Sequence, residues 1–386
     1  MYERILVKIY KHSGNVRLSK LCTNIIMCML SFISVIKYYL TPADHTEMTV
    51  VDEVAERSFV PKKIKRNEQV KYDLSIIIPA YNSSGTIDNC LESILKEDTD
   101  YNYEVIVIND GSKDDTLEKL AKYRELKNFT ILSHENRGIA CTRNRGLEEA
   151  AGKYIMFVDA DDIVPAETIN VLLNKAFSKN YDIIEGNYLN VYGDGKKVSG
   201  KALWQDDFEV DLKQNQEFIR EIKGFPWGRI YKRELWDNVE YPIGFEYEDT
   251  IIRFTIFRRA ETYAYINKNI YEYTLSTTSI SSRLKGTLNS LDTYFVAKYL
   301  IDNNRYLGVK EDEVFYKVVL NQFSSMLYYR SIGVNKEYKK YILSKSAETL
   351  TEIEDYCPQL SQKDRMLKSA ILEKNLKRWE ICCKWR

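Results

Sequence analysis

The sequence predicts an α/β fold: a mixed, mainly parallel sheet flanked by helices and followed by a helical C-terminal region. Two observations carry this prediction. Short apolar runs alternate with segments of helical spacing between residues 74 and 159. Residues 287–386 show mostly helical spacing. Alternation of the first kind favours parallel pairing of strands through right-handed crossovers.

The first part of the alternation is regular and the second part is not. Buried strands are expected at 74–79, 104–109, 129–133 and 153–159, and helices at 86–96, 114–123 and 137–151. Beyond residue 180, short strands are expected near 181–191, 262–266 and 270–275, and helices near 213–222 and 249–259. We therefore expect an N-terminal helical segment and linker at 1–72, an α/β domain at 73–285 with halves 73–190 and 191–285, and a helical region at 286–386.

Composition excludes several classes of protein. Lys+Arg and Asp+Glu both number 56 in the 386 residues, so the net charge is zero, which argues against a nucleic-acid binder. Seven cysteines without a CxxC pair, and three histidines, argue against a disulfide framework, a thiolate metal site and a His-rich metal site. Scattered reduced thiols are typical of a cytoplasmic protein.

Two segments suggest contact with a membrane surface. Residues 21–36 are largely apolar between basic flanks, but fall short of the roughly 20 residues that cross a bilayer comfortably. No small-residue cleavage site follows them. Residues 370–384 form a basic amphipathic helix, which can lie in a membrane interface. The alternatives are a true span at 21–36, or packing helices of a helical subdomain or a homo-oligomer contact.

Polar clusters follow three of the predicted strands. They are Pro79-Ala80-Tyr81-Asn82, Asp110-Gly111-Ser112 and Asp159-Ala160-Asp161-Asp162. Because the carboxyl ends of parallel strands share one edge of a sheet, these clusters should converge there, where α/β sheets bind ligands. An aromatic ring, a single carboxylate and a carboxylate pair suit a nucleoside diphosphate with a hard cation. Taken alone, each cluster is equally an ordinary turn or a helix cap, so the joint placement carries the prediction.

Four stretches occur in the order and spacing of a known family. They are SIIIPAYN (75–82), VIVINDGSKDDT (105–116), ENRGIACTRNRGL (135–147) and YIMFVDADD (154–162). This set resembles glycosyltransferase family 2, the inverting family with the GT-A fold, in its bacterial surface-polysaccharide type. The resemblance runs from about residue 74 to about 281. It implies an enzyme that moves a sugar from a nucleotide-sugar, with uracil the commonest base, to an acceptor hydroxyl.

The resemblance also implies roles on the nucleotide-sugar side. Pro79, Ala80 and Tyr81 would line the nucleoside pocket, and Asp110 would bind the base. Arg143, with Asn144, would order the pocket wall and help bind the diphosphate. Asp159 and Asp161, with Ala160 between them, would form the metal-binding motif for Mn²⁺ or Mg²⁺, with Asp161 the closest ligand.

A second part of the resemblance covers the acceptor side, in PWGRIYKRELW (226–236) and FEYEDT (245–250). Asp249, with Glu248 beside it, is expected to be the general base that inverting transfer needs. The alternative for this acidic pair is a helix N-terminus. Trp227 is expected to stack on an acceptor sugar or to lie in the core. Lys232 is expected to reach a phosphate or to lie at the surface.

One stretch departs from the family pattern. Residues 271–281 contain no Arg, Lys or His where relatives often carry a basic residue, although Arg283 and Lys285 follow. A sugar nucleotidyltransferase is disfavoured because PAYNSSGT after the first strand has no basic residue. A degenerate, non-catalytic nucleotide-sugar-binding subunit remains the alternative, and the presence of both Asp161 and Asp249 disfavours it. The expected partners are a UDP-sugar and a saccharide or lipid-linked saccharide acceptor at the inner face of the membrane.

Overall fold

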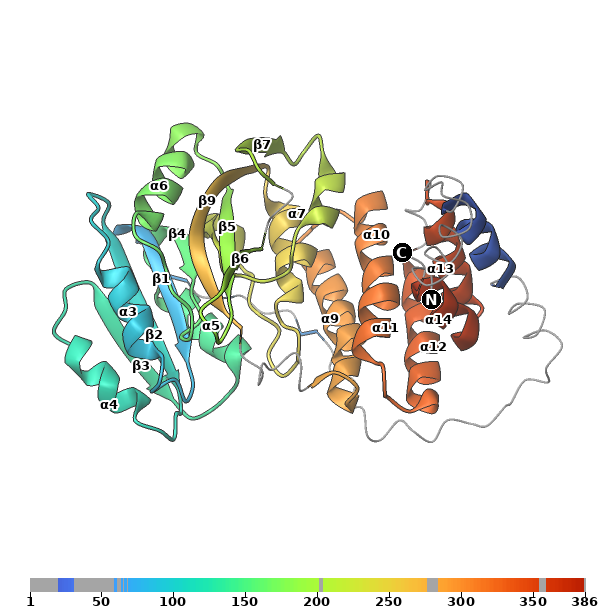
Figure 1. The fold of residues 1–386 in the computed structure, drawn as a ribbon, viewed down its shortest axis with the longest axis horizontal. Coiled ribbons are helices and arrows are strands. Elements are labelled where there is room, and N and C mark those ends of the chain that lie inside the picture. Colours follow the sequence, from blue (N-terminus) through green and yellow to red (C-terminus); the bar gives the residue numbers. More distant parts are fainter. Residues whose placement is uncertain are drawn as a thin grey trace. The chain divides into compact units, whose positions relative to one another are not determined.

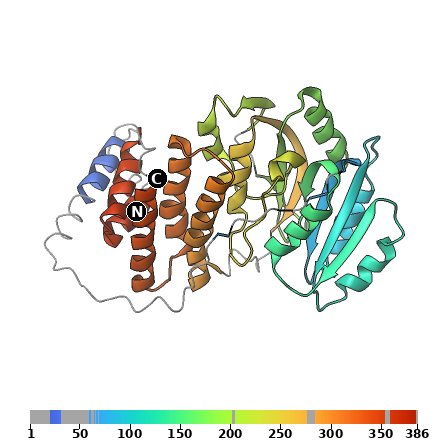
Figure 2. The same cartoon turned by 180° about the vertical axis from the view of Figure 1, so that it is seen from behind.

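The computed structural model describes residues 20–30, 59–60, 64, 66–67, 69–200, 204–275, 284–353 and 359–384. The chain divides into two compact units, one of residues 60–279 and one that joins residues 1–59 to residues 280–386. The first contains the sheet, and the second is helical (Figures 1 and 2). The grouping of N-terminal with C-terminal residues agrees with the alternative that both terminal segments belong to a helical subdomain.

The first unit is built on a mixed sheet. Its described residues form nine strands in one sheet, in the order β3-β2-β1-β4-β8-β5-β9-β7, with β6 paired to β5. The pairings among β1 to β4 are parallel, β8 is antiparallel to β4 and β5, and β9 is parallel to β5 but antiparallel to β7. The predicted mixed α/β fold with flanking helices is confirmed. The strands are β1 (Tyr72–Ala80), β2 (Tyr103–Asp110), β3 (Phe129–His134), β4 (Gly152–Phe157), β5 (Ile183–Val191), β6 (Lys197–Ser199), β7 (Phe208–Asp211), β8 (Arg229–Lys232) and β9 (Thr262–Thr274).

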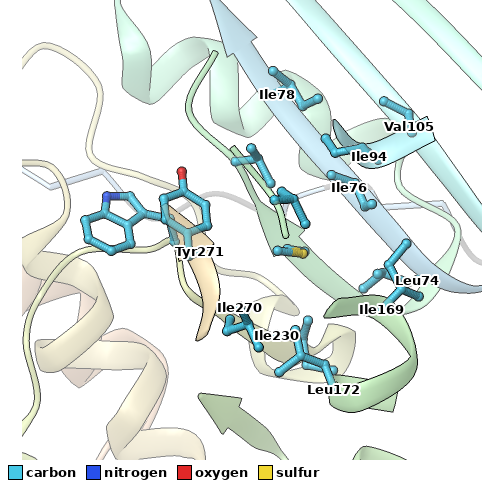
Figure 3. Packing of buried hydrophobic residues seen from close by; sticks show 14 of the residues in the cluster. Leu74, Ile76, Ile78, Ile94, Val105, Ile169, Leu172, Ile230, Ile270 and Tyr271 are labelled. Atoms are coloured by element: carbon cyan, nitrogen blue, oxygen red, sulfur yellow. The ribbon is translucent and has the colours of Figure 1, made fainter. Parts of the chain in front are cut away.

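Helices cover both faces of the parallel strands because the strands are apolar on both faces. The longer ones are α3 (Ile87–Leu95), α5 (Ile139–Glu149) and α6 (Thr168–Lys179); shorter turns are α4 (Thr116–Leu120), η2 (Ala121–Tyr123), η3 (Gln216–Glu221), η4 (Arg233–Trp236), η5 (Ile252–Ile256) and α7 (Phe257–Arg259). Alternate β1 residues pack with α3 and α6 in one buried cluster that continues to β8 and β9 (Figure 3). On the other face α5 packs so closely on β1 that a Cβ on Gly146 would lie 2.3 Å from Ile77 Cγ2. The absence of a side chain at Gly146 therefore permits this close approach.

The structure differs from the sequence expectation at several elements. Strands β6, β7 and β8 were not expected, and the helix expected near 213–222 is the short turn η3. The two strands expected at 262–266 and 270–275 are one strand, β9, whose register against β5 shifts at Gly186–Tyr188. A β-bulge absorbs this shift and keeps the strand continuous. Helix α6 was not expected, although its buried residues Ile169, Leu172, Leu173 and Ala176 have helical spacing.

The second unit is a group of packed helices. They are η6 (Leu288–Leu291), α9 (Asp292–Tyr306), α10 (Glu313–Asn321), η7 (Gln322–Met326), α11 (Leu327–Arg330), α12 (Lys336–Glu352), α13 (Gln362–Leu372) and α14 (Leu376–Cys383). The single helix expected at 370–384 is interrupted, because α13 ends at Leu372 and α14 begins at Leu376. The apolar face that was expected to lie on a membrane is buried inside this unit. Trp379 is 1% exposed and donates its indole N–H to the Phe323 carbonyl at 3.0 Å. Helix α14 is therefore a packing helix.

The N-terminal apolar run is described only in part. Residues 20–30 are helical, and residues 31–36 lie outside the described residues. Met27 is buried against Met366 and Ile381, whereas Leu21, Ile25 and Met29 are 58%, 50% and 59% exposed. In the part of the chain that the structure describes, no helix has the length and apolar character needed to span a membrane.

Candidate active site

The polar clusters that follow β1, β2 and β4 lie at one edge of the sheet. The register pairs Ala80 with Asn109 near the ends of β1 and β2, and Ile77 with Phe157 at the end of β4, so the residues that follow the three strands lie along the same edge. Pro79 and Ala80 are the last two residues of β1 and are buried, whereas Tyr81 directly after them is 46% exposed. Tyr81 therefore has an aromatic ring open to a ligand, as base stacking requires.

Asp110 is held by the chain segment that enters α5. Its Oδ1 accepts the backbone N–H of Arg137 at 2.7 Å, and its Oδ2 accepts that of Gly138 at 3.0 Å. Gly111 makes the approach possible: it has φ +66, and a Cβ there would lie 2.6 Å from the Asn136 nitrogen. Because a carboxylate has about four lone-pair sites, Asp110 retains acceptor capacity for a base N–H.

The turn after β4 carries three carboxylates in different settings. Asp161 is exposed, Asp159 is half-buried and Asp162 is fully buried. Asp162 accepts the hydroxyl of Tyr271 and the backbone N–H of Thr274, both at 2.7 Å. Burial, with the negative charge of Asp159 added, raises the pKa of Asp162 to about 8. Desolvation and the charge of Asp159 also raise the pKa of Asp161.

Strand β9 holds this turn in place. The Tyr271 hydroxyl accepts the backbone N–H of Asp159 at 3.0 Å while it donates to Asp162. Backbone bonds in both directions join Ile163 to Glu272. Neither Tyr271 nor Asp162 was among the predicted site residues. The adjacency of Asp162 to the Asp-x-Asp motif was a signal for it, but no local pattern marks Tyr271, which is far away in the sequence.

The donor set of the turn suits a hard cation that is shared with a diphosphate. Among the described residues, no group of three or more His, Cys, Asp or Glu side chains could hold a metal ion alone. Mg²⁺ is commonly bound by one or two carboxylates together with substrate phosphates and waters. Asp161 is exposed at the sheet edge and under the repulsion of Asp159, which a cation would relieve. The residues therefore fit a cation that arrives with the nucleotide.

Arg143 joins the turn to the acceptor side. Its Nη2 donates to Asp159 Oδ1 at 3.1 Å and its Nη1 donates to Glu248 Oε1 at 2.6 Å, with the side chain 5% exposed. Burial alone would lower the pKa of Arg143, but the two carboxylates raise it overall, so the guanidinium remains charged. The adjacent Asn144 bonds both the backbone N–H and carbonyl of Tyr241, at 2.7 and 2.9 Å.

Glu248 and Asp249 stand where a helix begins. The residues from Thr250 are helical, and the N–H groups of Ile251 and Ile252 bond the carbonyls of Glu248 and Asp249. Tyr247, immediately before the pair, is a buried residue with φ 61. A bulky residue in the left-handed region is strained, and such strain concentrates at functional sites. The acidic pair is thus a helix N-terminus and also lies at the same site as Arg143 and Asp159.

Two further predicted residues have structural partners. Trp227 is 6% exposed and stacks on Phe225, Tyr271 and Tyr273, with ring centroids 3.9, 4.8 and 4.8 Å apart. Its ring therefore supports the residue that holds the Asp159 turn and has little surface for a sugar.

Lys232 pairs in the sheet with Tyr154, at the end of β4 away from Asp159. Its ammonium lies 3.5 Å from Asp182. The structure does not bring Lys232 to the edge where the other predicted residues meet. Of the basic residues expected beyond β9, Arg283 lies outside the described residues, and Lys285 belongs to the helical unit.

The sequence profile of glycosyl transferase family 2 matches residues 75–255. These residues form a glycosyl transferase family 2 domain. The match covers every predicted site residue, from Pro79 to Asp249. It begins in β1 and ends within η5, so it includes both the nucleotide-sugar side and the acidic pair of the acceptor side.

Relatives of the family 2 domain occur in bacteria. Glycosyltransferase GlyA of Streptococcus pneumoniae is 29% identical over 54% of this chain and 31% of its own length. Glycosyltransferase GlyG of the same organism is 28% identical over 74% of this chain and 94% of its own length. The crystal structure of S. aureus TarS 1–349 in complex with UDP superposes with a TM-score of 0.64 and 22% identity, over 81% of this chain and 90% of that chain. The TarS likeness shows the same GT-A fold.

Proposed function

We propose that this protein is an inverting glycosyltransferase that moves a sugar from a UDP-sugar to an acceptor hydroxyl, with Mn²⁺ or Mg²⁺ bound at Asp161. One observation carries the proposal: within the family 2 domain, Arg143 brings the Asp159 turn and the Glu248-Asp249 pair together. Inverting transfer needs a diphosphate site and a general base on opposite sides of one anomeric carbon.

Different residues are suited to bind different parts of the UDP-sugar donor. Tyr81 has an exposed ring to stack on the base, and Asp110 has acceptor capacity for its imide N–H. The choice of uracil is supported by the TarS relative, whose structures hold UDP and UDP-GlcNAc. A divalent cation at Asp161 would neutralise charge on the leaving diphosphate.

The proposed reaction is a single displacement. The acceptor oxygen attacks the anomeric carbon, the bond from that carbon to the diphosphate oxygen breaks, and UDP leaves. The Asp249 carboxylate takes the proton of the acceptor hydroxyl as the new bond forms. No enzyme nucleophile is needed, because inversion takes one step.

The experiment is a panel of UDP-sugars with Mn²⁺ in which UDP release is measured for the wild type and for Asp161→Ala. We expect metal-dependent release from one donor, lost in Asp161→Ala. Calorimetry with UDP and Mn²⁺ accompanies it. Binding without release by any donor, with or without acceptor, would favour the non-catalytic subunit, and no binding would overturn the nucleotide site.

For the acceptor, we propose a lipid-linked or growing polysaccharide at the inner face of the membrane. The exposed apolar side chains of the helix at 20–30, namely Leu21, Ile25 and Met29, support peripheral contact with lipid. Replacing all three with serine should reduce binding to anionic vesicles in a sedimentation assay. Undiminished binding would show that this helix is not the anchor.

A further inference from the structure

The buried guanidinium of Arg143 contacts residues from two separate segments of the domain. It lies between Asp159 of the nucleotide-sugar side and Glu248 of the acceptor side, and its Cζ is 5.4 Å from the centroid of the Tyr241 ring. The Nε atom is buried and has no hydrogen-bond partner among the described residues. The two carboxylates use one N–H of each terminal nitrogen, and the side chain is 5% exposed. Burial, rather than full use of its five N–H groups, therefore limits the access of a diphosphate to the guanidinium.

Asn144, the next residue of α5, also bonds to the acceptor-side segment. Asn144 uses both its amide nitrogen and its amide oxygen on the backbone of Tyr241. Consecutive residues of α5 therefore fix two points of the acceptor-side segment, at residues 241 and 248. Because these bonds tie side chains of α5 to the acceptor-side segment, α5 sets where this segment lies relative to the Asp159 turn.

In each acidic motif, one carboxylate is bound to Arg143. In the first motif this is Asp159, and Asp161 two residues later is exposed. In the second motif it is Glu248, and Asp249 follows it at the start of the helix. Because the bond to a buried guanidinium fixes where such a carboxylate lies, Asp159 and Glu248 are suited to hold their segments in place.

We propose that Arg143 is a positioning residue: through Asp159 and Glu248 it holds the two motifs in register, so that Asp161 and Asp249 do the binding and the proton transfer. Glu248 is then a positioning residue as well, and not the base. This inference rests on the proposed function and deepens it, because it gives Arg143 and Glu248 a positioning role and removes Arg143 from the direct ligands of the diphosphate.

The test compares Arg143→Lys, Glu248→Gln and the double variant, with Arg145→Lys as the matched control. Arg145 is on the same helix, but its partners Glu148 and Glu149 are on that helix too. Calorimetry measures the affinity for UDP and for uridine with Mn²⁺, and kinetics with the active donor give kcat and KM. Circular dichroism and thermal unfolding establish that each variant is folded.

We expect each single variant to lower kcat about 10- to 100-fold with its UDP affinity within about threefold of wild type, as removal of a transition-state alignment requires. The double variant should be no worse than the poorer single one by more than about twofold, because residues that act as one unit are not additive. Arg145→Lys should match the wild type.

Three results would overturn the inference. In the first, Arg143→Lys weakens UDP binding more than about tenfold but leaves uridine binding intact, which would make it a diphosphate ligand. In the second, the effects of the two variants multiply. In the third, Glu248→Gln alone abolishes turnover as completely as Asp249→Asn; this arm remains decisive if Arg143→Lys does not fold. Absence of UDP binding by the wild type would instead overturn the proposed function, and this inference with it.

Discussion

The carboxylate of Asp110 and the arginine-held carboxylates of the family 2 domain are fixed by different means. Asp110 is fixed by two backbone N–H groups, those of Arg137 and Gly138. The arginine-held carboxylates are fixed by buried guanidinium groups: Asp159 and Glu248 by Arg143, and Glu185 by Arg229. Backbone N–H groups exist at almost any residue, whereas each arginine is a single irreplaceable side chain.

This difference indicates which parts of the domain are most sensitive to single substitutions. A group held by the backbone depends on the local path of the chain, which the sheet and α5 set together. A group held by a buried arginine depends on one charge, and loss of that charge leaves the partner buried and uncompensated. We therefore expect the arginine-held carboxylates to respond more severely to single substitutions, and the following four predictions test this.

The largest expected effect is on catalysis. Asp249→Asn keeps the shape of the side chain but removes the proposed base, so kcat should fall about 10²- to 10⁴-fold. The affinity for UDP, measured by calorimetry, should stay near that of the wild type, because Asp249 is on the acceptor side. A variant with normal kcat would place the base elsewhere.

The next effect is on stability. Arg229 and Glu185 are 0% and 1% exposed, and Tyr263 also donates to Glu185, at 3.0 Å. Arg229→Met should lower the free energy of unfolding by about 3–5 kcal/mol, because Glu185 would remain buried without its cation. Urea unfolding of Arg229→Met/Glu185→Leu should show most of the loss recovered. A loss in the single variant below about 1 kcal/mol would contradict the comparison.

A smaller loss of stability is expected at the turn that carries Asp159 and Asp162. Tyr271→Phe removes the hydroxyl that joins Asp159 and Asp162 and should cost about 1–3 kcal/mol, since it leaves buried polar groups unsatisfied. It should also weaken Mn²⁺-dependent UDP binding in calorimetry, because the turn with Asp161 loosens. Tyr273→Phe, on the same strand and stacked on the same tryptophan, is the control. Equal effects of both variants would show that the bonds of the Tyr271 hydroxyl to Asp159 and Asp162 have no special importance.

The smallest effect should come from an exposed ion pair. Lys179 lies 2.8 Å from Glu209, but its side chain is 66% exposed. Lys179→Gln should leave the free energy of unfolding, measured with urea, within error of the wild-type value, because solvent screens surface charges. A loss as large as that of Arg229→Met would show that ion pairing itself, rather than burial, makes the arginine-held carboxylates sensitive.

The sequence was informative where function follows from local pattern. Apolar runs such as LSIIIP predict buried strands, and the residues after them lie at a shared edge whatever the details of packing. Tyr81, Asp110, Asp159 and Asp161 were predicted on this ground, and the structure places all of them at that edge. The acidic pair at 248–249 came from family resemblance, because its surroundings have no regular period.

Tertiary structure alone decided the rest. The bonds of Arg143 to Glu248, and of Tyr271 to Asp162, join residues more than a hundred positions apart. The burial of Trp227 and of the apolar face around Trp379 also depended on which surfaces meet. A local pattern determines which way a side chain faces along its own strand or helix. What it meets there depends on chain segments that only the complete fold brings together.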